Sequence, residues 1–129
     1  MIQVMIVEDD PMVREINSKF LKRVEGFVLY KAVSNLYDAK KFIAMKKPDL
    51  ILLDVYLPKE NGIDLLKWIR KQDIDIDIIL ITADKSIERI QEAFRGGVVD
   101  YLIKPFNFER FKESLIQFKG RYYEFKKIM

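Results

Sequence analysis

The sequence predicts an α/β fold in which a doubly wound, five-stranded parallel sheet is flanked by five helices. Two observations support this prediction. Five short apolar runs rich in β-branched residues alternate along the chain with amphipathic helical patterns. Several runs are apolar at every position, which is typical of strands buried on both faces, and parallel strands need a crossover helix between them. A chain of 129 residues, half of them hydrophobic, has room for one such domain.

The predicted strands and helices follow one another in regular order. The strands are expected at residues 2–7, 28–33, 50–53, 78–81 and 101–103. Each helix is expected to begin at a local signal: Asp10 before Pro11, Ser34 or Asn35, the loop at Gly62, Ser86, and Asn107. The expected ends of the first, second and fourth helices are Gly26, Pro48 and the Gly96–Gly97 pair.

The last helical pattern continues past the expected end of the domain. Its apolar residues are spaced four, three, four, three and four apart, as in a heptad seam: Phe111, Leu115, Phe118, Tyr122, Phe125 and Met129. We expect one domain over residues 1–119. Residues 120–129 are then a helical extension or the start of a linker to an output domain outside this chain, and a frayed tail is the alternative for so short a seam.

The amino-acid composition excludes several kinds of chemistry for this chain. The 23 basic and 20 acidic side chains nearly balance, so the net charge of +3 indicates a mixed surface and not, by itself, nucleic-acid binding. The absence of cysteine excludes disulfides and thiol nucleophiles, and a cytoplasmic location is the simplest interpretation. The absence of histidine removes the commonest general base and any phosphohistidine within the chain. No apolar run approaches the ~20 residues that span a bilayer, so no membrane association is expected.

Polar signatures follow four of the five predicted strands: Glu8-Asp9-Asp10, Asp54, Thr82 and Lys104-Pro105. Each of these signatures alone could have a purely structural role, such as a helix cap or a turn. Together they lie at the carboxyl ends of the strands, where doubly wound folds bind ligands. Clustered carboxylates repel one another unless a cation offsets their charge, and Mg²⁺ prefers such hard oxygen ligands. Beside that ion, a carboxylate can attack a phosphoryl group while a lysine stabilises its oxygens.

Four motifs carry a resemblance to a known family: VEDD at 7–10, LLDVYLPKENG at 52–62, ITAD at 81–84 and DYLIKPF at 100–106. In their order and spacing they resemble the receiver domain of bacterial two-component response regulators, over residues 1 to about 119. The resemblance implies a flavodoxin-like (βα)5 topology with strand order 2-1-3-4-5. It also implies a signalling phosphoacceptor, which promotes its own phosphorylation and slow dephosphorylation, and not an enzyme.

The resemblance implies a role for each matching residue. Asp54 is the phosphoacceptor. Mg²⁺, or Mn²⁺ in its place, is held by Asp9, Asp54, Glu8 through water, and the backbone carbonyl of Tyr56. Thr82 and Lys104 contact the phosphoryl group, Tyr101 rotates when Thr82 moves, and the Lys104–Pro105 peptide is cis. Glu8 departs from the commonest pattern, in which aspartate stands at this position.

Two further positions flank the route of the attacking water in this family. Tyr56 and Asp84 each lie two residues beyond a site residue, and we expect them to tune dephosphorylation. Tyr56 could shield the phosphoryl group and Asp84 could orient water toward it, while solvated loop residues are the structural alternative. The loop residue Gly62 is expected to supply a backbone conformation that a Cβ would resist.

The resemblance also implies an output surface and partners. Phosphorylation is expected to repack the face of the fourth helix, fifth strand and fifth helix, with candidate residues Ile90, Phe94, Val99, Tyr101, Phe106 and Phe111. Ordinary core packing is the alternative, above all for Phe94. A sensor histidine kinase donates the phosphoryl group, and activation favours a homodimer through this face or the C-terminal helix. The stretch GVVDYLIKPFNFERF resembles citrate and C4-dicarboxylate-responsive regulators, which control transcription through a DNA-binding domain absent from this chain; these residues themselves are not expected to bind nucleic acid.

Three other functions compete with this interpretation. A haloacid dehalogenase-type phosphatase also uses a strand-end aspartate with Mg²⁺, but it needs a second aspartate where this chain has Tyr56. A flavodoxin-like cofactor module needs a phosphate-binding loop after the first strand, where Glu8, Asp9 and Asp10 would repel phosphate. A pure interaction module requires a degenerate site, whereas the four main site residues are all present.

Overall fold

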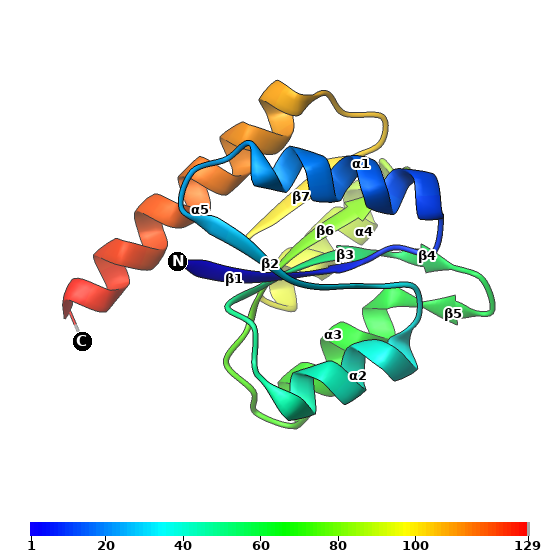
Figure 1. The fold of residues 1–129 in the computed structure, drawn as a ribbon. Helices are drawn as coiled ribbons and strands as arrows, with labels where there is room; N and C mark the ends of the chain where they lie inside the picture. The colour runs from blue at the N-terminus through cyan, green and yellow to red at the C-terminus, as the bar shows by residue number, and fades with distance from the viewer. Residues whose placement is uncertain (129) are drawn as a thin grey trace.

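The computed structural model describes residues 1–128 as one α/β domain (Figure 1). The central sheet is formed by β1 (Ile2–Val7), β2 (Phe27–Val33), β3 (Leu50–Asp54), β6 (Asp77–Thr82) and β7 (Asp100–Ile103). All neighbouring pairs are parallel, in the order β2-β1-β3-β6-β7. Counted over these five strands, the order is the predicted 2-1-3-4-5, and each predicted strand is present.

Five helices cover the two faces of the sheet. They are α1 (Pro11–Lys22), α2 (Leu36–Met45), α3 (Gly62–Lys71), α4 (Ile87–Arg95) and α5 (Phe108–Ile128). Helices α1 and α5 lie on one face and α2 and α3 on the other (Figure 1). Two buried apolar clusters correspond to these layers, one including residues of α2, α3 and α4 and the other including residues of α1 and α5. Strands β1, β3 and β6 are buried almost throughout, as the continuous apolar runs predicted, whereas only Phe27 and Val33 are buried in the edge strand β2.

Local capping explains where most helices begin. Asp10 accepts hydrogen bonds from the backbone N–H groups of Met12 and Val13 at the start of α1. Asn35, and not Ser34, caps α2, and Ser86 caps α4. The predicted end of α1 at Gly26 was wrong, because the helix ends at Lys22 with Arg23 as its C-cap. Gly26 lies later, at a φ of 96° in the turn that leads into β2.

A short hairpin after β3 was not predicted. β4 (Tyr56–Leu57) pairs antiparallel with β5 (Glu60–Asn61), and Lys59 in the turn between them has a φ of 62°. The hairpin projects from the same edge of the sheet as the carboxyl ends of the strands (Figure 1). It leads directly into α3, whose first residue, Gly62, is buried.

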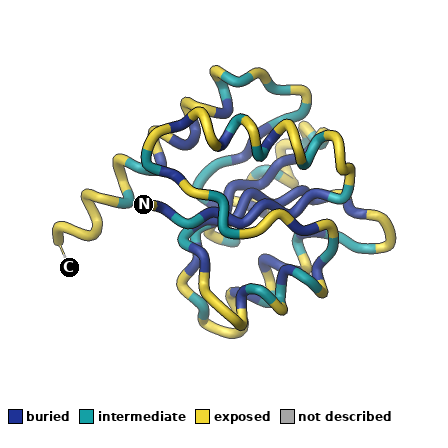
Figure 2. The backbone as a smooth tube through the Cα atoms, viewed as in Figure 1, coloured by how far each residue is buried: buried dark blue, intermediate teal, exposed yellow. Residues whose placement is uncertain are grey.

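The C-terminal helix is longer than its contacts with the sheet require. Phe111, Leu115 and Phe118 are buried in the core. Tyr122 is partly buried and donates a hydrogen bond to Asp49 at 3.0 Å, whereas Phe125 is 63% exposed. The last turns extend beyond the sheet and are exposed (Figure 2). The first half of the predicted seam is therefore occupied by the domain's own core, and its last position, Met129, lies outside the described residues.

Within residues 1–128, no helix combines the length and the apolar character that crossing a bilayer requires.

Candidate functional site

The strand register brings the polar signatures together. Parallel pairing sets Val7 beside Leu53, Asp54 beside Ile81, and Thr82 beside Ile103. The residues at the ends of β1, β3, β6 and β7 therefore meet at one edge of the sheet. This is the edge at which the sequence predicted the site.

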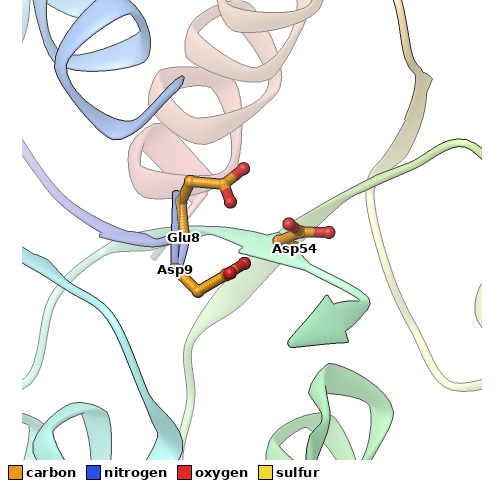
Figure 3. A group of neighbouring side chains, drawn as sticks. All are labelled: Glu8, Asp9 and Asp54. Atoms are coloured by element: carbon orange, nitrogen blue, oxygen red, sulfur yellow. The ribbon is translucent and has the colours of Figure 1, made fainter. Parts of the chain in front are cut away.

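Three carboxylates form the centre of the site. One oxygen each from Glu8, Asp9 and Asp54 can be chosen so that the three lie within 4.8 Å of one another. In Figure 3, Glu8 and Asp9 at the end of β1 and Asp54 at the end of β3 gather around a common space. Glu8 is only 2% exposed and Asp54 only 4%, so water screens their charges poorly.

Lys104 is the cation of the cluster. Its Nζ lies 3.0 Å from Glu8 Oε1 and 3.1 Å from Asp54 Oδ2. The Lys104–Pro105 peptide is cis, as the resemblance implied, and the Lys104 N–H donates to the carbonyl of Thr82 at 2.8 Å. Burial by itself lowers the pKa of Lys104, but its contacts with Glu8 and Asp54 outweigh burial and hold the pKa above its ordinary value. Lys104 is therefore charged at neutral pH.

The charges fit a divalent cation. One ammonium group faces three carboxyl groups, so the cluster carries excess negative charge when all three are ionised. Burial raises the pKa of Glu8, and the nearby Asp54 adds to this effect. Hard oxygen donors with uncompensated charge are the ligands that Mg²⁺ prefers. Glu8, Asp9 and Asp54 could hold that ion, whereas a ligand role for the Tyr56 carbonyl stays a prediction.

The predicted switch residues lie beside the cluster. Thr82 is fully buried, and its Oγ1 accepts a hydrogen bond from the Asp84 N–H at 3.1 Å. Tyr101 is turned inward: it is 8% exposed, and its hydroxyl donates to the Asp84 carbonyl at 3.1 Å. Burial, followed by the charge of Asp84, raises the pKa of Tyr101. Both residues thus contact the segment that leads into α4.

Tyr56 and Asp84 are bonded to each other, a contact that the sequence analysis missed. The Tyr56 hydroxyl donates to Asp84 Oδ2 at 2.9 Å, and the Tyr56 N–H donates to Asp54 Oδ1 at 3.2 Å. The second oxygen of Asp84 accepts from the Ser86 N–H at 2.8 Å. The Ser86 and Tyr56 hydrogen bonds lower the pKa of Asp84, while the bond to Asp84 raises the pKa of Tyr56. The pair joins the acceptor loop to the segment after Thr82.

Arg14 is a second contributor that sequence reasoning missed. Its Nη1 donates to the backbone carbonyls of Glu8 at 2.8 Å and Asp9 at 3.2 Å. The Asp10 N–H donates to Glu8 Oε2 at 3.1 Å. These contacts orient the acidic loop. The available signal was that an arginine one turn into α1 lies close to the loop that precedes the helix.

The six candidate residues of the output face differ in exposure. Phe94 is 48% exposed, so the core interpretation weighed for it was wrong. Ile90, Val99 and Phe106 are partly buried against the two core clusters. Tyr101 is buried, and Phe111 is fully buried and stacks on Phe106 with ring centroids 6.1 Å apart. Phe111 therefore supports this face from beneath and does not form its surface.

Comparison with known proteins identifies relatives over nearly the whole chain. The response regulator receiver domain family matches residues 4–116. The chain is 40% identical over 127 residues to the probable C4-dicarboxylate response regulator DctR of Halalkalibacterium halodurans, covering 98% of this chain and 55% of that protein. It is 44% identical over 121 residues to the transcriptional regulatory protein MalR of Bacillus subtilis, covering 94% of the chain and 52% of MalR. The chain thus spans about half the length of these relatives.

Solved structures share the fold. The response regulatory domain of mrkE from Klebsiella pneumoniae has a TM-score of 0.86 at 27% identity, covering 95% of this chain and 99% of that one. A DNA-binding response regulator of the LuxR family from Staphylococcus aureus has a TM-score of 0.82 at 26% identity, covering 91% and 98%. With the topology, the clustered site residues and the family match in agreement, the chain belongs to the response regulator receiver domains.

Proposed function

We propose that this domain accepts a phosphoryl group on Asp54 from a partner histidine kinase and uses it as a signal. The observation that carries the proposal is the placement of a buried Asp54 carboxylate 3.1 Å from Lys104 and within 4.8 Å of the Glu8 and Asp9 carboxylates. A nucleophilic oxygen, a fixed cation and a site for a second cation are thereby combined. Phosphoryl transfer needs little more than such positioning and charge neutralisation.

The chemistry follows from these positions. An Asp54 oxygen forms a bond to phosphorus while the phosphorus–nitrogen bond of a phosphohistidine donor breaks, and the donor imidazole leaves with that electron pair. Lys104 already contacts Asp54 and is placed to stabilise the oxygens of the transferred group. Bound Mg²⁺ would neutralise charge shared by the carboxylates and the phosphoryl group. Glu8, Asp9 and Asp54 are the residues that would hold it.

The same group would drive the switch. Phosphorylation adds about two negative charges and three acceptor oxygens. Thr82, whose Oγ1 now accepts from Asp84, can turn to donate to one of these oxygens. Because Tyr101 and Thr82 both bond to Asp84, movement of Thr82 shifts the segment before α4. The α4–β7–α5 face is thereby repacked, and we propose that the repacked face favours a homodimer.

The Tyr56–Asp84 hydrogen bond suggests whether these two residues speed or slow dephosphorylation. Its 2.9 Å length means that one Asp84 oxygen is occupied by the Tyr56 hydroxyl while the other is occupied by the Ser86 N–H. A carboxylate so engaged is poorly available to orient an attacking water. We therefore propose that the pair, when closed, slows hydrolysis of the phosphorylated Asp54.

The relatives suggest a setting for this chemistry. Their printed names are those of transcription regulators and C4-dicarboxylate response regulators, and about half of each lies beyond the region matched here. We propose that this domain controls transcription in the cytoplasm through a DNA-binding domain in that other half. A membrane sensor that responds to C4-dicarboxylates would then be coupled to the kinase.

Intact mass after incubation with acetyl phosphate and Mg²⁺ tests the proposal. We expect one hydroxylamine-labile phosphoryl adduct, which is absent in Asp54→Asn and after chelation of the metal. Asp49→Asn is the matched control, because Asp49 also adjoins β3 but lies at its opposite end. An adduct retained in Asp54→Asn would refute the acceptor assignment. No adduct in a chain shown to bind Mg²⁺ would favour a pure interaction module.

A further inference from the structure

Helix α4 has few apolar contacts to hold it in place. Ala93 is its only buried residue among the nine from Ile87 to Arg95. Between α4 and α3 lies a cavity of about 260 Å³, lined by residues that include Leu66, Leu80, Ala93 and Tyr101. A helix that stands over a cavity packs less of its apolar surface against its neighbours, so it gains less from apolar burial. Its position must depend largely on polar contacts at its two ends.

Arg70 makes those contacts at the C-terminal end. From the last turn of α3, its guanidinium donates through Nε to the Gly96 carbonyl at 3.1 Å and through Nη2 to the Gly97 carbonyl at 3.3 Å. The remaining arm, Nη1, donates to the Ile76 carbonyl at 3.0 Å. Gly96 is the C-cap of α4, so its carbonyl has no partner within the helix and lies at the partially negative end, and Gly97 follows it directly. One side chain thus joins the end of α4 to α3 and to the segment before β6.

Asp84 makes the contacts at the other end. Its side chain accepts from the N–H of Ser86, the N-cap of α4, and from the Tyr56 hydroxyl. A nine-residue helix is about 14 Å long, and its backbone hydrogen bonds hold its two ends in one continuous unit. A change in how Arg70 holds one end of α4 is therefore transmitted to the Tyr56–Asp84 bond at the other end.

We propose that Arg70 is a positioning residue for the acceptor site: by anchoring the C-terminal end of α4 to α3, it keeps the Tyr56–Asp84 pair closed and prolongs the phosphorylated state of Asp54. This inference rests on the proposed phosphoacceptor function and adds a distant determinant of its lifetime. Arginine suits the role because its planar guanidinium reaches three carbonyls at once, which the single ammonium group of lysine cannot do in the same geometry.

The test compares rates of phosphoryl loss after acetyl phosphate is removed. We expect Arg70→Gln to lose the group about fivefold faster than the natural chain, a change typical of modest coupling between sites. Lys67→Gln is the matched control, because Lys67 lies on the same helix, lines the same cavity and carries the same charge. A double variant tests the route: in a Tyr56→Phe background, which already lacks the hydroxyl, Arg70→Gln should change the rate by much less.

Hydrogen exchange on the unphosphorylated chain gives an independent measurement. Arg70→Gln should speed exchange of the Gly96, Gly97 and Val98 amides, which close the end of α4, while Lys67→Gln should not. Faster exchange with an unchanged phosphoryl lifetime would overturn the positioning role and leave Arg70 merely structural. An equal rate effect in both Tyr56 backgrounds would overturn the route through α4. If the natural chain takes no phosphoryl group, the proposed function fails first and this inference with it.

Discussion

At the scale of single residues, the backbone around the acceptor is built without room for additional atoms. Gly62 opens α3 and lies against the backbone of Asp54, where a Cβ at position 62 would collide with the Asp54 carbonyl oxygen. Its N–H donates to the Val55 carbonyl at 2.7 Å, which closes the hairpin loop onto the end of β3. The sequence analysis expected Gly62 for its backbone conformation, and this was wrong: its φ is not in the left-handed region, and the reason for glycine is close approach.

A methyl group at position 62 should therefore disturb the acceptor itself. We expect Gly62→Ala to lower the free energy of unfolding by about 1–3 kcal/mol, the usual cost of overpacking, and to reduce phosphorylation of Asp54. Urea unfolding and adduct formation measure the two effects. Gly120→Ala is the control: it lies within α5 with nothing within 4 Å of an added Cβ, so the change should stabilise the chain by about 0.5–1 kcal/mol. Equal effects of the two substitutions would contradict the steric argument.

At the scale of elements, an ion pair joins β7 to α5 beneath the proposed output face. Arg110 Nη2 lies 3.0 Å from Asp100 Oδ1, whose side chain is 18% exposed. Burial alone would raise the pKa of Asp100, but the hydrogen bonds it accepts, among them those from Arg110 and the Tyr101 N–H, outweigh burial and lower that pKa below its ordinary value of 3.8. A carboxylate with a lowered pKa in the folded state stabilises the fold above its unfolded pKa and loses this contribution as pH falls through its folded pKa.

The contribution of Asp100 to the free energy of unfolding should therefore depend on pH. At pH 7 we expect Asp100→Asn to lower the free energy of unfolding by about 1 kcal/mol. As the pH falls from 3.8 through the lower folded-state pKa, the difference should shrink and then disappear, because the natural carboxyl group becomes protonated as well. Urea unfolding of both chains at a series of pH values from 7 downward measures this difference. Glu113→Gln is the comparison, since Glu113 also contacts Arg110 but is 60% exposed, and its effect should stay below about 0.5 kcal/mol. A difference that persists at low pH would rule out the charge as its source.

The elements themselves were predicted well where local chemistry determines them. Apolar runs located all five sheet strands, and Asp10, Ser86 and Asn107 marked helix starts through side-chain capping. The β4–β5 hairpin escaped prediction because its two-residue strands have no apolar run and depend on pairing across a turn. The exposure of Phe94 was not predicted for a related reason: a helical pattern shows which residues share a face, but not which face meets the sheet.

At the scale of the whole molecule, the proposed output face has an exposed aromatic residue on α4. It is also linked to Thr82 and Tyr101, the buried residues proposed to move on phosphorylation. Phe94 on α4 is 48% exposed and Ile87 is 70% exposed. Helix α2, which packs on the same apolar cluster as α4, carries a comparable residue, Tyr37, which is 76% exposed. Exposed apolar side chains on both helices offer contact surfaces. Of these two helices, α4 is the one whose preceding segment contacts Thr82 and Tyr101, through Asp84.

Dimerisation on activation should therefore depend on α4. We expect the phosphorylated chain to sediment as a dimer at concentrations where the unmodified chain is a monomer. Phe94→Asp should weaken that dimer by about tenfold or more, because a charge would be buried in an apolar contact. Tyr37→Asp, an equally drastic change on α2, should have no effect. Sedimentation that stays the same on phosphorylation, over a wide concentration range, would argue against this dimer.

The sequence by itself determined the α/β architecture and the edge of the sheet at which Glu8, Asp9, Asp54, Thr82 and Lys104 gather. These follow from hydrophobic periodicity and from the rule that parallel strands end at one edge. Only the tertiary structure decided which side chains meet: the Tyr56–Asp84 bond, the Arg70 contacts with the end of α4, and the approach of Gly62 to Asp54. The first two join segments 28 and 26 residues apart in the chain, and the third brings Gly62 back onto Asp54 after the β4–β5 hairpin. All three depend on how the chain packs in three dimensions, which no local pattern records.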